Sequence, residues 1–336
     1  MNRKILLLNK SGLNEPFLKA LRTEGFDVVA FFNGKLRPFE INYFHKIINL
    51  FRRNLLGDKQ YLNRAERKFN VQQYIKRSRE LKKQNFDYAL FFRADLYPEK
   101  MIQNIRKISK KMISDQYDGM EVGRKILDYR PYFDRLFVFD PDDLKNYKHL
   151  GLLPITNCWF PDDEKKEEVK QDFFYVGVGT GDRQQKIKKM QEEISGRFSL
   201  KAILTIPFFR EEQVFKGIQF SHQGLTYSEN IKEIQSSKCL IDFKLDYHNG
   251  LSFRFFEAMY YGKKIITNNS SVKNYDFYHS NNILITDFVD FSCLSEFLEK
   301  PYHPVDAEVV SKYGFINWIK YVLDIEPYQQ ITLPKV

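Results

Sequence analysis

Cysteine is scarce in this sequence of 336 residues. The three cysteines, Cys158, Cys239 and Cys293, form no CxxC pair, and an odd number cannot build a complete set of disulfides. A disulfide framework and a cysteine zinc site are therefore poor expectations, and the set fits a reducing cytoplasm. The six histidines, at positions 45, 149, 222, 248, 279 and 303, also lack the spacing of a zinc-binding pair.

Long hydrophobic runs are absent as well. No apolar stretch approaches the ~18 residues of a membrane span, so we expect no transmembrane helix. The apolar run Ile5–Leu8 is shorter than the ~7–15 apolar residues of a signal peptide, so we expect no signal peptide either. Disorder is excluded as the main state, because 31 Phe and 20 Tyr supply ample core material. A prior of about 150 residues per domain predicts two domains.

Positive charge is concentrated in one segment. Between Phe44 and Lys83, twelve Lys and Arg residues face three acidic residues, which gives +9 of the net charge of +10. Three interpretations remain open: a solvated helical face, a patch for anionic lipid headgroups, and a nucleic-acid surface. The lipid interpretation rests on interleaved apolar residues. The nucleic-acid one ranks last, because we find no nucleic-acid module. The apolar residues are Phe44, Ile47, Ile48, Leu50, Phe51, Leu55, Leu56, Tyr61 and Leu62.

Strands and helices are expected to alternate in both halves of the chain, which predicts α/β architecture with parallel sheets. A charged stretch, 162–170, separates the halves as a linker. The expected strands are Lys4–Leu8, Asp27–Phe32, Tyr88–Phe92, Lys111–Ser114, Arg135–Phe139, Phe173–Val178, Leu200–Leu204, Cys239–Phe243 and Lys264–Thr267. The expected helices begin near Asn14, Pro98, Met120, Pro141 (capped by Asp140), Arg183, Ser228 (capping its own helix) and Ser252, with two more in the basic segment broken near Gly57.

These elements predict two Rossmann-like doubly wound domains whose loops face each other across a cleft. The first domain is residues 1–160, with a basic helical insertion at 41–84, and the linker is 161–171. The second domain is 172–315. A C-terminal helix and tail, 316–336, is expected to pack back on the first domain.

The most informative stretch runs from His248 to Thr267. Its helix is apolar on most sides, and Arg254 and Glu257 share the one polar stripe. A carboxylate on a nearly buried helix needs partners. One interpretation is an internal pair between Arg254 and Glu257. The other is that Glu257 accepts hydrogen bonds from ribose hydroxyls while N–H groups at Gly250, Leu251 and Ser252 hold a diphosphate.

This stretch resembles the donor-site motif of GT-B nucleotide-sugar glycosyltransferases, and in particular the CgeB-like branch of capsular and lipopolysaccharide biosynthesis. The sharp part of the resemblance is Gly250 to Asn268, including Glu257-Ala-Met and Gly262-Lys-Lys-Ile-Ile-Thr-Asn. A weaker part runs from Tyr132 to Asp143. The sequence departs from the motif at Asn249, where many retaining members carry a first glutamate. Retention of the anomeric configuration is therefore not implied.

A second motif is the glycine-rich turn from Tyr175 to Arg183. Glycines 177, 179 and 181, with Thr180, let the backbone approach a phosphate, and Arg183 could neutralise it. The alternative interpretation of this motif is a tight turn followed by a helix that Asp182 caps. The resemblance implies that this loop faces the donor diphosphate. It also implies that the turn before the next helix holds the nucleobase, with Tyr227 as a stacking candidate beside the alternative of an exposed tyrosine.

An inverting transferase also needs a base for the acceptor hydroxyl. Asp95, Asp115 and Asp118 follow first-domain strands and are the candidates, although each could be a helix cap. Ser11 and Gly12 are the expected acceptor-side residues. Asp140-Pro-Asp142 matches the Asp-x-Asp motif of metal-binding sites, but its position between an expected strand and an expected helix favours a helix cap. We therefore expect neither a required metal nor another cofactor.

The resulting prediction is a cytoplasmic glycosyltransferase, which would be peripheral on the inner face of the plasma membrane if the basic segment binds lipid. It would use a UDP- or GDP-linked sugar and a saccharide or lipid-linked acceptor, in bacterial capsule or lipopolysaccharide assembly, without nucleic acid. The alternatives are a nucleotide-sugar epimerase or phosphorylase of the same fold, and a non-catalytic scaffold that binds acidic partners through the basic segment.

Overall fold

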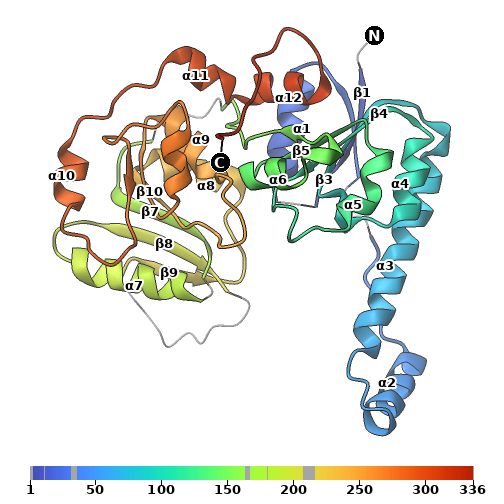
Figure 1. The fold of residues 1–336 in the computed structure, drawn as a ribbon. Coiled ribbons are helices and arrows are strands. Elements are labelled where there is room, and N and C mark those ends of the chain that lie inside the picture. Colours follow the sequence, from blue (N-terminus) through green and yellow to red (C-terminus); the bar gives the residue numbers. More distant parts are fainter. Residues whose placement is uncertain are drawn as a thin grey trace. The chain divides into compact units, whose positions relative to one another are not determined.

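The computed structural model describes residues 3–10, 12–31, 36–162, 167–179, 181–206 and 216–335 (Figure 1). The chain forms two compact units. Unit 1 comprises Met1–Asn14, Leu21–Gln116 and Gly123–Leu136, and unit 2 comprises Glu15–Ala20, Tyr117–Val122 and Phe137–Val336. None of the helices in these described ranges is long and apolar enough to cross a membrane.

The first sheet has six strands in the order β2-β1-β3-β4-β5-β6. Parallel pairing explains the continuous apolar runs, because both faces of such a sheet are covered; Ile5 to Leu8 are fully buried. The order has one switch point. After β1 the chain goes to β2 at the edge and then returns to β3 on the other side of β1. The strands are β1 Lys4–Leu8, β2 Asp27–Ala30, β3 Phe86–Phe92, β4 Ser109–Gln116, β5 Arg135–Val138 and β6 Leu153–Pro154.

The helices around this sheet mostly begin where the sequence predicts. Asp140 caps α6 by accepting from the Asp142 backbone N–H at 3.0 Å, as expected. The short elements of this half are η2 Leu81–Lys83, η3 Ala94–Leu96, η4 Arg130–Tyr132 and η5 Lys148–Leu150. The α-helices are α1 Asn14–Thr23, α2 Tyr43–Leu55, α3 Tyr61–Glu80, α4 Glu99–Arg106, α5 Ile126–Tyr129 and α6 Pro141–Asn146.

The predicted helix at Met120 is wrong. The chain turns after β4, with Gly119 at φ 79°, and the next helix, α5, begins only at Ile126. The backbone N–H of Met120 instead donates to the carboxylate of Asp143 at 2.9 Å. Met120 is completely buried. A long-range contact to α6 therefore replaces the local helix that the sequence suggested.

The second sheet also has six parallel strands, in the order β12-β11-β10-β7-β8-β9. Its switch point lies between β7 and β10, because the chain moves out from β7 to β9 and then returns to β10. The sequence analysis missed β9 and β12, which are short edge strands. The strands are β7 Gln171–Val178, β8 Leu200–Thr205, β9 Ile218–Ser221, β10 Ser237–Asp242, β11 Lys264–Thr267 and β12 Ile283–Ile285.

One helix cap in this half differs from the prediction. The α8 helix is capped by Thr226, not Ser228, through a capping box in which Thr226 and Glu229 bond to each other's backbone. The helices are α7 Asp182–Ile194, α8 Tyr227–Gln235, α9 Phe253–Tyr261, the short η6 Ser270–Asn274, α10 Leu294–Glu299, α11 Ala307–Lys312 and α12 Phe315–Leu323.

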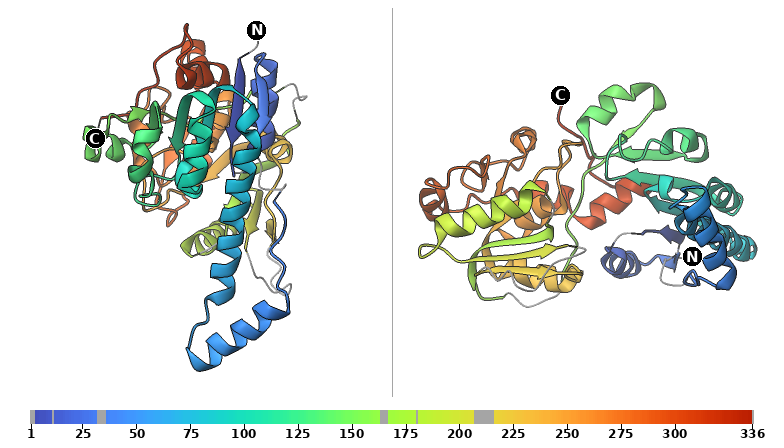
Figure 2. Two further views of the ribbon diagram at one scale, coloured as in Figure 1. Left: turned by 90° about the vertical axis from the view of Figure 1, so that its right-hand side faces the viewer. Right: turned by 90° about the horizontal axis from the view of Figure 1, so that it is seen from below.

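The C-terminal helix α12 packs on residues from the first half of the sequence, all within unit 2. Trp318 Nε1 donates to the Thr156 carbonyl at 2.8 Å, and the Tyr321 hydroxyl donates to the Pro154 carbonyl at 2.9 Å. The Phe17 ring lies 5.7 Å from the Trp318 ring, edge on. Two further views show the course of the chain through this region and along α3 (Figure 2).

Candidate functional site

Two helix N-termini and two strand ends meet at the switch point of the second sheet. Strands β7 and β10 are hydrogen-bonded neighbours, and their carboxyl ends, Val178 and Asp242, lead into the loops before α7 and α9. Ligands of doubly wound sheets bind in the crevice at such a point. The glycine-rich turn and the loop at residues 243–252 are therefore placed together by topology.

The helices at this point leave their first N–H groups uncapped. In the part of the chain that the structure describes, neither Gly181 before α7 nor Ser252 before α9 makes a side-chain cap hydrogen bond. The neighbouring α8, by contrast, satisfies its own terminus through Thr226 and Glu229. Uncapped N–H groups and the helix dipole attract anions. The two termini beside the switch point are thus the ones open to a phosphate.

A hollow of about 460 Å³ lies at the same place. This volume falls within the ~300–1,000 Å³ of small-molecule sites. Asp182 is already engaged with Lys186 at 2.6 Å. The hollow therefore combines cationic side chains with an open helix end. Its lining includes Gly181, Asp182, Arg183, Lys186, Lys244, Asp246, Tyr247 and Asn268.

Two glycines of the turn are required by close contacts. A Cβ on Gly177 would lie 2.8 Å from the Tyr175 hydroxyl, and one on Gly179 would lie 2.8 Å from Leu204 Cβ. Gly181 has φ 61°, which disfavours other residues. Thr180 lies outside the described residues. These glycines let the backbone follow the strand end closely, which is compatible with a phosphate-binding turn but does not require one.

The carboxylate of Asp242 organises the neighbouring side chains. It is 2% exposed and accepts hydrogen bonds from Ser252 Oγ at 2.6 Å and Thr267 Oγ1 at 3.1 Å. Arg254 lies 3.4 Å away as an ion-pair partner. The Ser252 hydroxyl is turned toward Asp242, and Ser252 makes no side-chain cap hydrogen bond to α9.

Arg254 is held by three groups, none of which is Glu257. Besides Asp242, its guanidinium donates to the Val176 carbonyl and lies 5.3 Å from the centre of the Tyr175 ring. The interpretation of an internal Arg254–Glu257 ion pair therefore fails: Arg254 acts on Glu257 only as a nearby positive charge. The α9 helix directs the two side chains to different partners.

Glu257 is a buried carboxyl group with few compensating partners. It is 3% exposed, and burial raises its pKa to about 7, against the opposing effects of Arg254 and a hydrogen bond from Asn230 on α8. Tyr227 is near enough for Glu257 to raise its pKa further, after the larger effect of burial. Burying a carboxyl group with few partners costs free energy of folding, and a buried acid with a strongly shifted pKa is a candidate for a functional site.

The Tyr227 ring is packed against the protein. It is half-buried, and its edge meets the Phe160 ring at a centroid distance of 5.5 Å. Tyr227 is therefore not the exposed tyrosine that the sequence left as an alternative. Its backbone lies at the start of α8, directly after the turn 224–226. That turn is exposed at Gly224 and Thr226.

The loop before α9 is fixed by α6. The Asn249 backbone N–H donates to Asp140 at 3.0 Å, and its side-chain amide donates to Asp142 at 2.6 Å. A Cβ on Gly250 would lie 2.3 Å from the Phe139 ring, and Asn157 donates to the Leu251 carbonyl at 2.8 Å. Asn249 is thus engaged structurally, and Asp140 and Asp142 anchor this loop as well as cap α6.

His248 lies among carboxylates. Burial lowers its pKa, while Asp140, Asp118 and Asp242 oppose that effect. Its ring packs edge on against Phe139 at 4.8 Å, and its Nδ1 is buried without a hydrogen-bond partner among the described residues. The structure therefore brings Asp118 into the electrostatic neighbourhood of the loop that precedes α9.

Asp95 lies at the switch point of the first sheet, after β3. Both carboxylate oxygens accept from Arg93, at 2.8 and 2.7 Å, and both side chains are nearly buried. Arg93 adopts φ 56°, in the left-handed region. A carboxylate committed to such a pair is poorly placed to accept a proton from a substrate hydroxyl.

Lys10, after β1, faces the same switch point. Its ammonium lies 4.4 Å from the Tyr74 ring centre and 4.5 Å from that of Tyr97, and it donates to the Leu96 carbonyl at 2.7 Å. Burial lowers its pKa to about 8, although Asp95 opposes this. Lys10 and Asp95 line a hollow of about 650 Å³ in unit 1, together with Asn63, Glu66, Arg67, Asn70 and Lys125 among others.

The remaining candidates are less informative. Asp115 is 5% exposed near the end of β4, beside the fully buried Gln116, whose side-chain amide has no partner among the described residues. A Cβ on Gly12 would meet nothing within 4 Å. Ser11 lies outside the described residues.

Sequence reasoning missed Asp242 and Lys10 and undervalued His248. A signal for Asp242 was present: it is the one polar residue that ends the apolar run Cys239-Leu-Ile, at the carboxyl edge of a buried strand. Lys10 likewise follows a fully apolar strand. Polar residues in this position are the natural candidates in any parallel sheet.

Comparison with solved structures shows the fold. An α-glucosyltransferase in complex with UDP and a 13-mer DNA containing a HMU base matches with TM-score 0.59 and 13% identity, covering 97% of this chain and 99% of that one. Sucrose-phosphate synthase from Thermosynechococcus elongatus matches with TM-score 0.57 and 11% identity, covering 94% and 96%.

A third structure, UDP-GlcNAc 2-epimerase from Neisseria meningitidis bound to UDP-GlcNAc, matches with TM-score 0.53 and 11% identity, covering 92% and 97%. No family model and no curated protein matches the sequence. The two-sheet, doubly wound α/β architecture predicted from the alternation of strands and helices is confirmed. The narrower CgeB-like resemblance stays a prediction.

The burial of Glu257 has a consequence for stability. Its raised pKa means that the folded protein prefers the neutral acid, so the stabilising effect is complete below about pH 4.5 and is lost as the pH rises through about 7. Glu257→Gln removes this dependence. Relative to the wild type, the variant should gain on the order of 3 kcal/mol between pH 4.5 and pH 8, at about 1.4 kcal/mol per pKa unit.

Urea unfolding at several pH values measures this difference. Glu192→Gln provides the matched control, because it makes the same chemical change at an exposed position on α7. The control should show no comparable pH dependence. Equal behaviour of the two variants would show that Glu257 is not a buried acid in solution.

Proposed function

We propose that the protein is a glycosyltransferase that takes its sugar from a UDP- or GDP-linked donor. The observation that carries the proposal is the combination at the second switch point. Basic side chains and the uncapped N-terminus of α7 line a hollow, and α9, whose N-terminus is also uncapped and which carries the buried, poorly compensated Glu257, starts at the same switch point. These features suit a diphosphate and a ribose respectively.

In this proposal, the N-termini of α7 and α9, with Arg183 and Lys244, bind the donor diphosphate. Glu257 accepts hydrogen bonds from ribose hydroxyls, and the turn before α8 holds the base. Glycosyl transfer leaves a nucleoside diphosphate whose charge grows as the glycosidic bond breaks. Fixed N–H groups and cations stabilise that developing charge without reorganising, which is the main source of catalysis assigned to this site.

The hollow at the first switch point is the proposed acceptor site. Lys10, Arg67 and Lys125 give it cationic character, and Asn63 and Asn70 offer amides for hydroxyl groups. Such a lining suits a saccharide or the head of a lipid-linked saccharide. We propose assembly of a bacterial surface polysaccharide, capsule or lipopolysaccharide, as the setting, on the strength of the sequence resemblance at Gly250 to Asn268.

Among the candidate bases, Asp118 is the one we propose. It acts electrostatically on His248, in the loop that leads into α9, whereas Asp95 is bound on both oxygens by Arg93. Burial lowers the pKa of His248, which packs against Phe139 in the same loop. Asp115 stays an alternative on sequence grounds alone.

An epimerase is the second candidate function. The match to an epimerase bound to UDP-GlcNAc supports it, because an epimerase and a transferase share a need for a nucleotide-sugar site. A non-catalytic scaffold is the third, supported by the basic segment. Mass detection of products separates them: a transferase or its hydrolytic side reaction releases nucleoside diphosphate, an epimerase returns an isomeric donor, and a scaffold does neither.

The first prediction of the proposal concerns nucleotide binding. Glu257→Gln preserves shape but weakens charge-assisted hydrogen bonds of about 1.5–3 kcal/mol each, so affinity for UDP or GDP should fall about ten- to a hundredfold. Titration calorimetry above pH 7, where the carboxylate is ionised, measures the change. Glu192→Gln should bind like the wild type. Unchanged affinity in Glu257→Gln would remove the ribose role.

The second prediction concerns the base. Asp118→Asn should lower kcat by about 10²–10⁴-fold while calorimetric donor affinity stays within about twofold, because a general base acts on the acceptor and not on the donor. Asp95→Asn instead leaves a buried Arg93 half-compensated, so its principal effect should be a lower melting temperature. Full activity of Asp118→Asn would exclude this residue.

The third prediction concerns metal. Because helix termini, Arg183 and Lys244 are proposed to neutralise the diphosphate, turnover should persist in EDTA. Product release is followed with the donor identified by calorimetry, before and after chelation. Activity that disappears in EDTA and returns with Mn²⁺ or Mg²⁺ would contradict the proposed charge balance.

A further inference from the structure

Helix α2 packs on the protein with its polar side. Its half-buried residues are His45, Asn49 and Arg52, at spacings of four and three, and they face α3. His45 Nδ1 lies 3.0 Å from the Tyr61 hydroxyl, and the Arg52 guanidinium lies 5.4 Å from the centre of the same ring. No residue of α2 is fully buried.

The opposite, outward side of α2 is apolar. Phe44, Ile47, Ile48, Phe51 and Leu55 recur at helical spacing, so they share one face. Phe44 is 73% exposed and Leu55 is 70% exposed. Tyr43, Leu50 and Leu56, each above 60% exposed, extend this apolar surface. An amphipathic helix normally buries its apolar side, so α2 is inverted with respect to its own protein.

The inversion is built into the structure by specific contacts. Asn42 caps α2 by accepting from the His45 N–H at 3.0 Å. Gly57 turns the chain with φ 65°, and Asp58 then pairs with both Arg52 and Arg64. The Phe39 ring lies 5.6 Å from the Phe69 ring of α3 in a tilted arrangement. These contacts hold α2 by its polar side and so present its apolar side outward.

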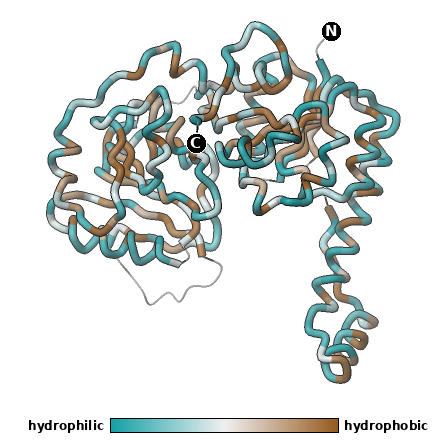
Figure 3. Tube along the Cα trace, in the orientation of Figure 1, coloured by the Kyte–Doolittle hydropathy of each residue, from teal (hydrophilic) through white to brown (hydrophobic). Residues whose placement is uncertain are grey.

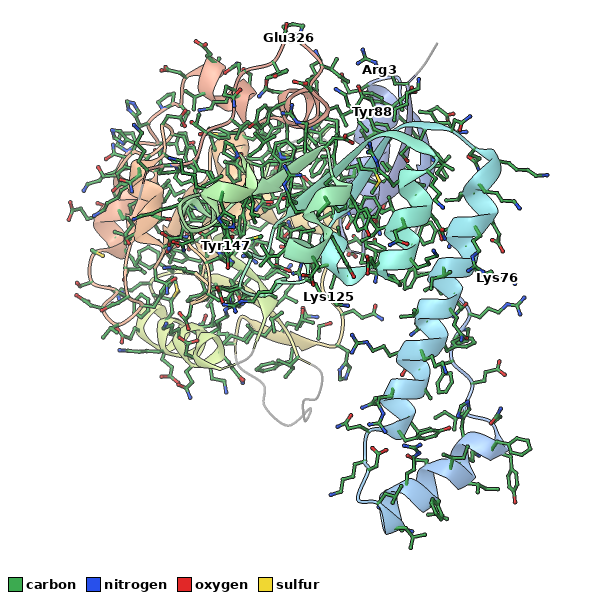
Figure 4. All side chains as sticks on the ribbon, turned by 45° about the vertical axis from the view of Figure 1, so that its right-hand side comes forward. Arg3, Lys76, Tyr88, Lys125, Tyr147 and Glu326 are labelled. Atoms are coloured by element: carbon green, nitrogen blue, oxygen red, sulfur yellow. The ribbon has the colours of Figure 1, made fainter. Side chains whose placement is uncertain are left out.

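Within unit 1, α2 and the first half of α3, residues 43–70, form an arm that projects from the rest of the unit (Figures 1 and 2). Hydrophobic stretches of the chain appear at its tip (Figure 3). With all side chains drawn, those of α2 stand clear of the sheet, beyond Lys76 on α3 (Figure 4). An apolar face at the end of an arm requires a partner outside its own unit.

We propose that the arm inserts the apolar face of α2 into the surface of an anionic lipid bilayer. Charge decides between occupants. The segment from Phe44 to Lys83 carries +9, which favours a negatively charged surface. A second copy of the same face would bring two such segments together against repulsion. An amphipathic helix with aromatic and basic residues suits the headgroup boundary, where both parts find partners.

This inference does not depend on the proposed function, because its measurement is partitioning and not turnover. The full chain is mixed with phosphatidylcholine vesicles with or without phosphatidylglycerol, and bound protein is collected by flotation. We expect binding to the phosphatidylglycerol vesicles, little binding to pure phosphatidylcholine, and loss of binding as salt rises.

Two variants separate the apolar contribution from the charge. The triple change Phe44→Ser, Phe51→Ser and Leu55→Ser should weaken the partition coefficient at least tenfold with an unchanged melting temperature, since all three side chains are exposed. Lys46→Gln with Arg53→Gln and Lys68→Gln should weaken binding at low salt and flatten the salt dependence. These basic residues are exposed and avoid the Asp58 contacts.

The matched control is Val122→Ser with Val169→Ser and Val289→Ser, three exposed apolar residues outside the arm, which should bind like the wild type. Phe44→Trp measures insertion directly. Brominated lipids should quench the fluorescence of the tryptophan introduced at position 44 if this side chain enters the bilayer. Wild type that ignores anionic vesicles at low salt would overturn the proposal. So would binding that survives the serine triple, or a wild-type dimer that the triple dissociates.

Discussion

Asp242 ends β10 with 2% of its surface exposed, and its carboxylate receives Ser252, Thr267 and Arg254. Each of these contacts constrains a different element: the entry to α9, the end of β11, and the side of α9 that faces β7. A buried negative charge is tolerable only when fully partnered. The contacts to Asp242 therefore hold the Arg254 guanidinium in place and turn the Ser252 hydroxyl toward the end of β10, while Ser252 makes no cap hydrogen bond to α9.

The position of this carboxylate follows from topology. In both sheets the chain reverses its direction of travel across the sheet once, between β1 and β3 and between β7 and β10. Polar residues that end these strands have no neighbouring crossover helix above them. Lys10 and Asp95 occupy the first switch point, and Asp242 and the glycine-rich turn occupy the second. Polar and charged side chains are found at these strand ends in each unit because the strands themselves consist of buried apolar residues.

Much of this arrangement could be predicted from the sequence. Apolar runs such as Ile5–Leu8 and Cys239–Ile241 identify buried parallel strands, and the Ser252–Gly262 pattern identifies α9 and its C-terminal glycine. The errors arise where distant contacts override local preference. The local sequence at Met120 predicts the start of a helix, but the Met120 N–H donates a hydrogen bond to the distant Asp143 carboxylate instead. The partner of Arg254 depends on the register between β7 and β10, which no local pattern contains. The spacing of three residues on one helix suggested Glu257 as the ion-pair partner of Arg254.

Glu257 and α2 both depart from the rule that apolar groups are buried and acids exposed, and both find little compensation in their own unit. Glu257 is an acid buried on an apolar helix, and α2 exposes its apolar side while its polar side packs on α3. Sequences usually agree with their structure at every level, and departures concentrate where function requires them. The first departure lacks a compensating group within the described part of unit 2 beyond Asn230 and the charge of Arg254. The second lacks a covering surface within the described part of unit 1. The proposed partners, a ribose and an anionic bilayer, would supply hydroxyl donors to the carboxylate and an apolar surface to the helix.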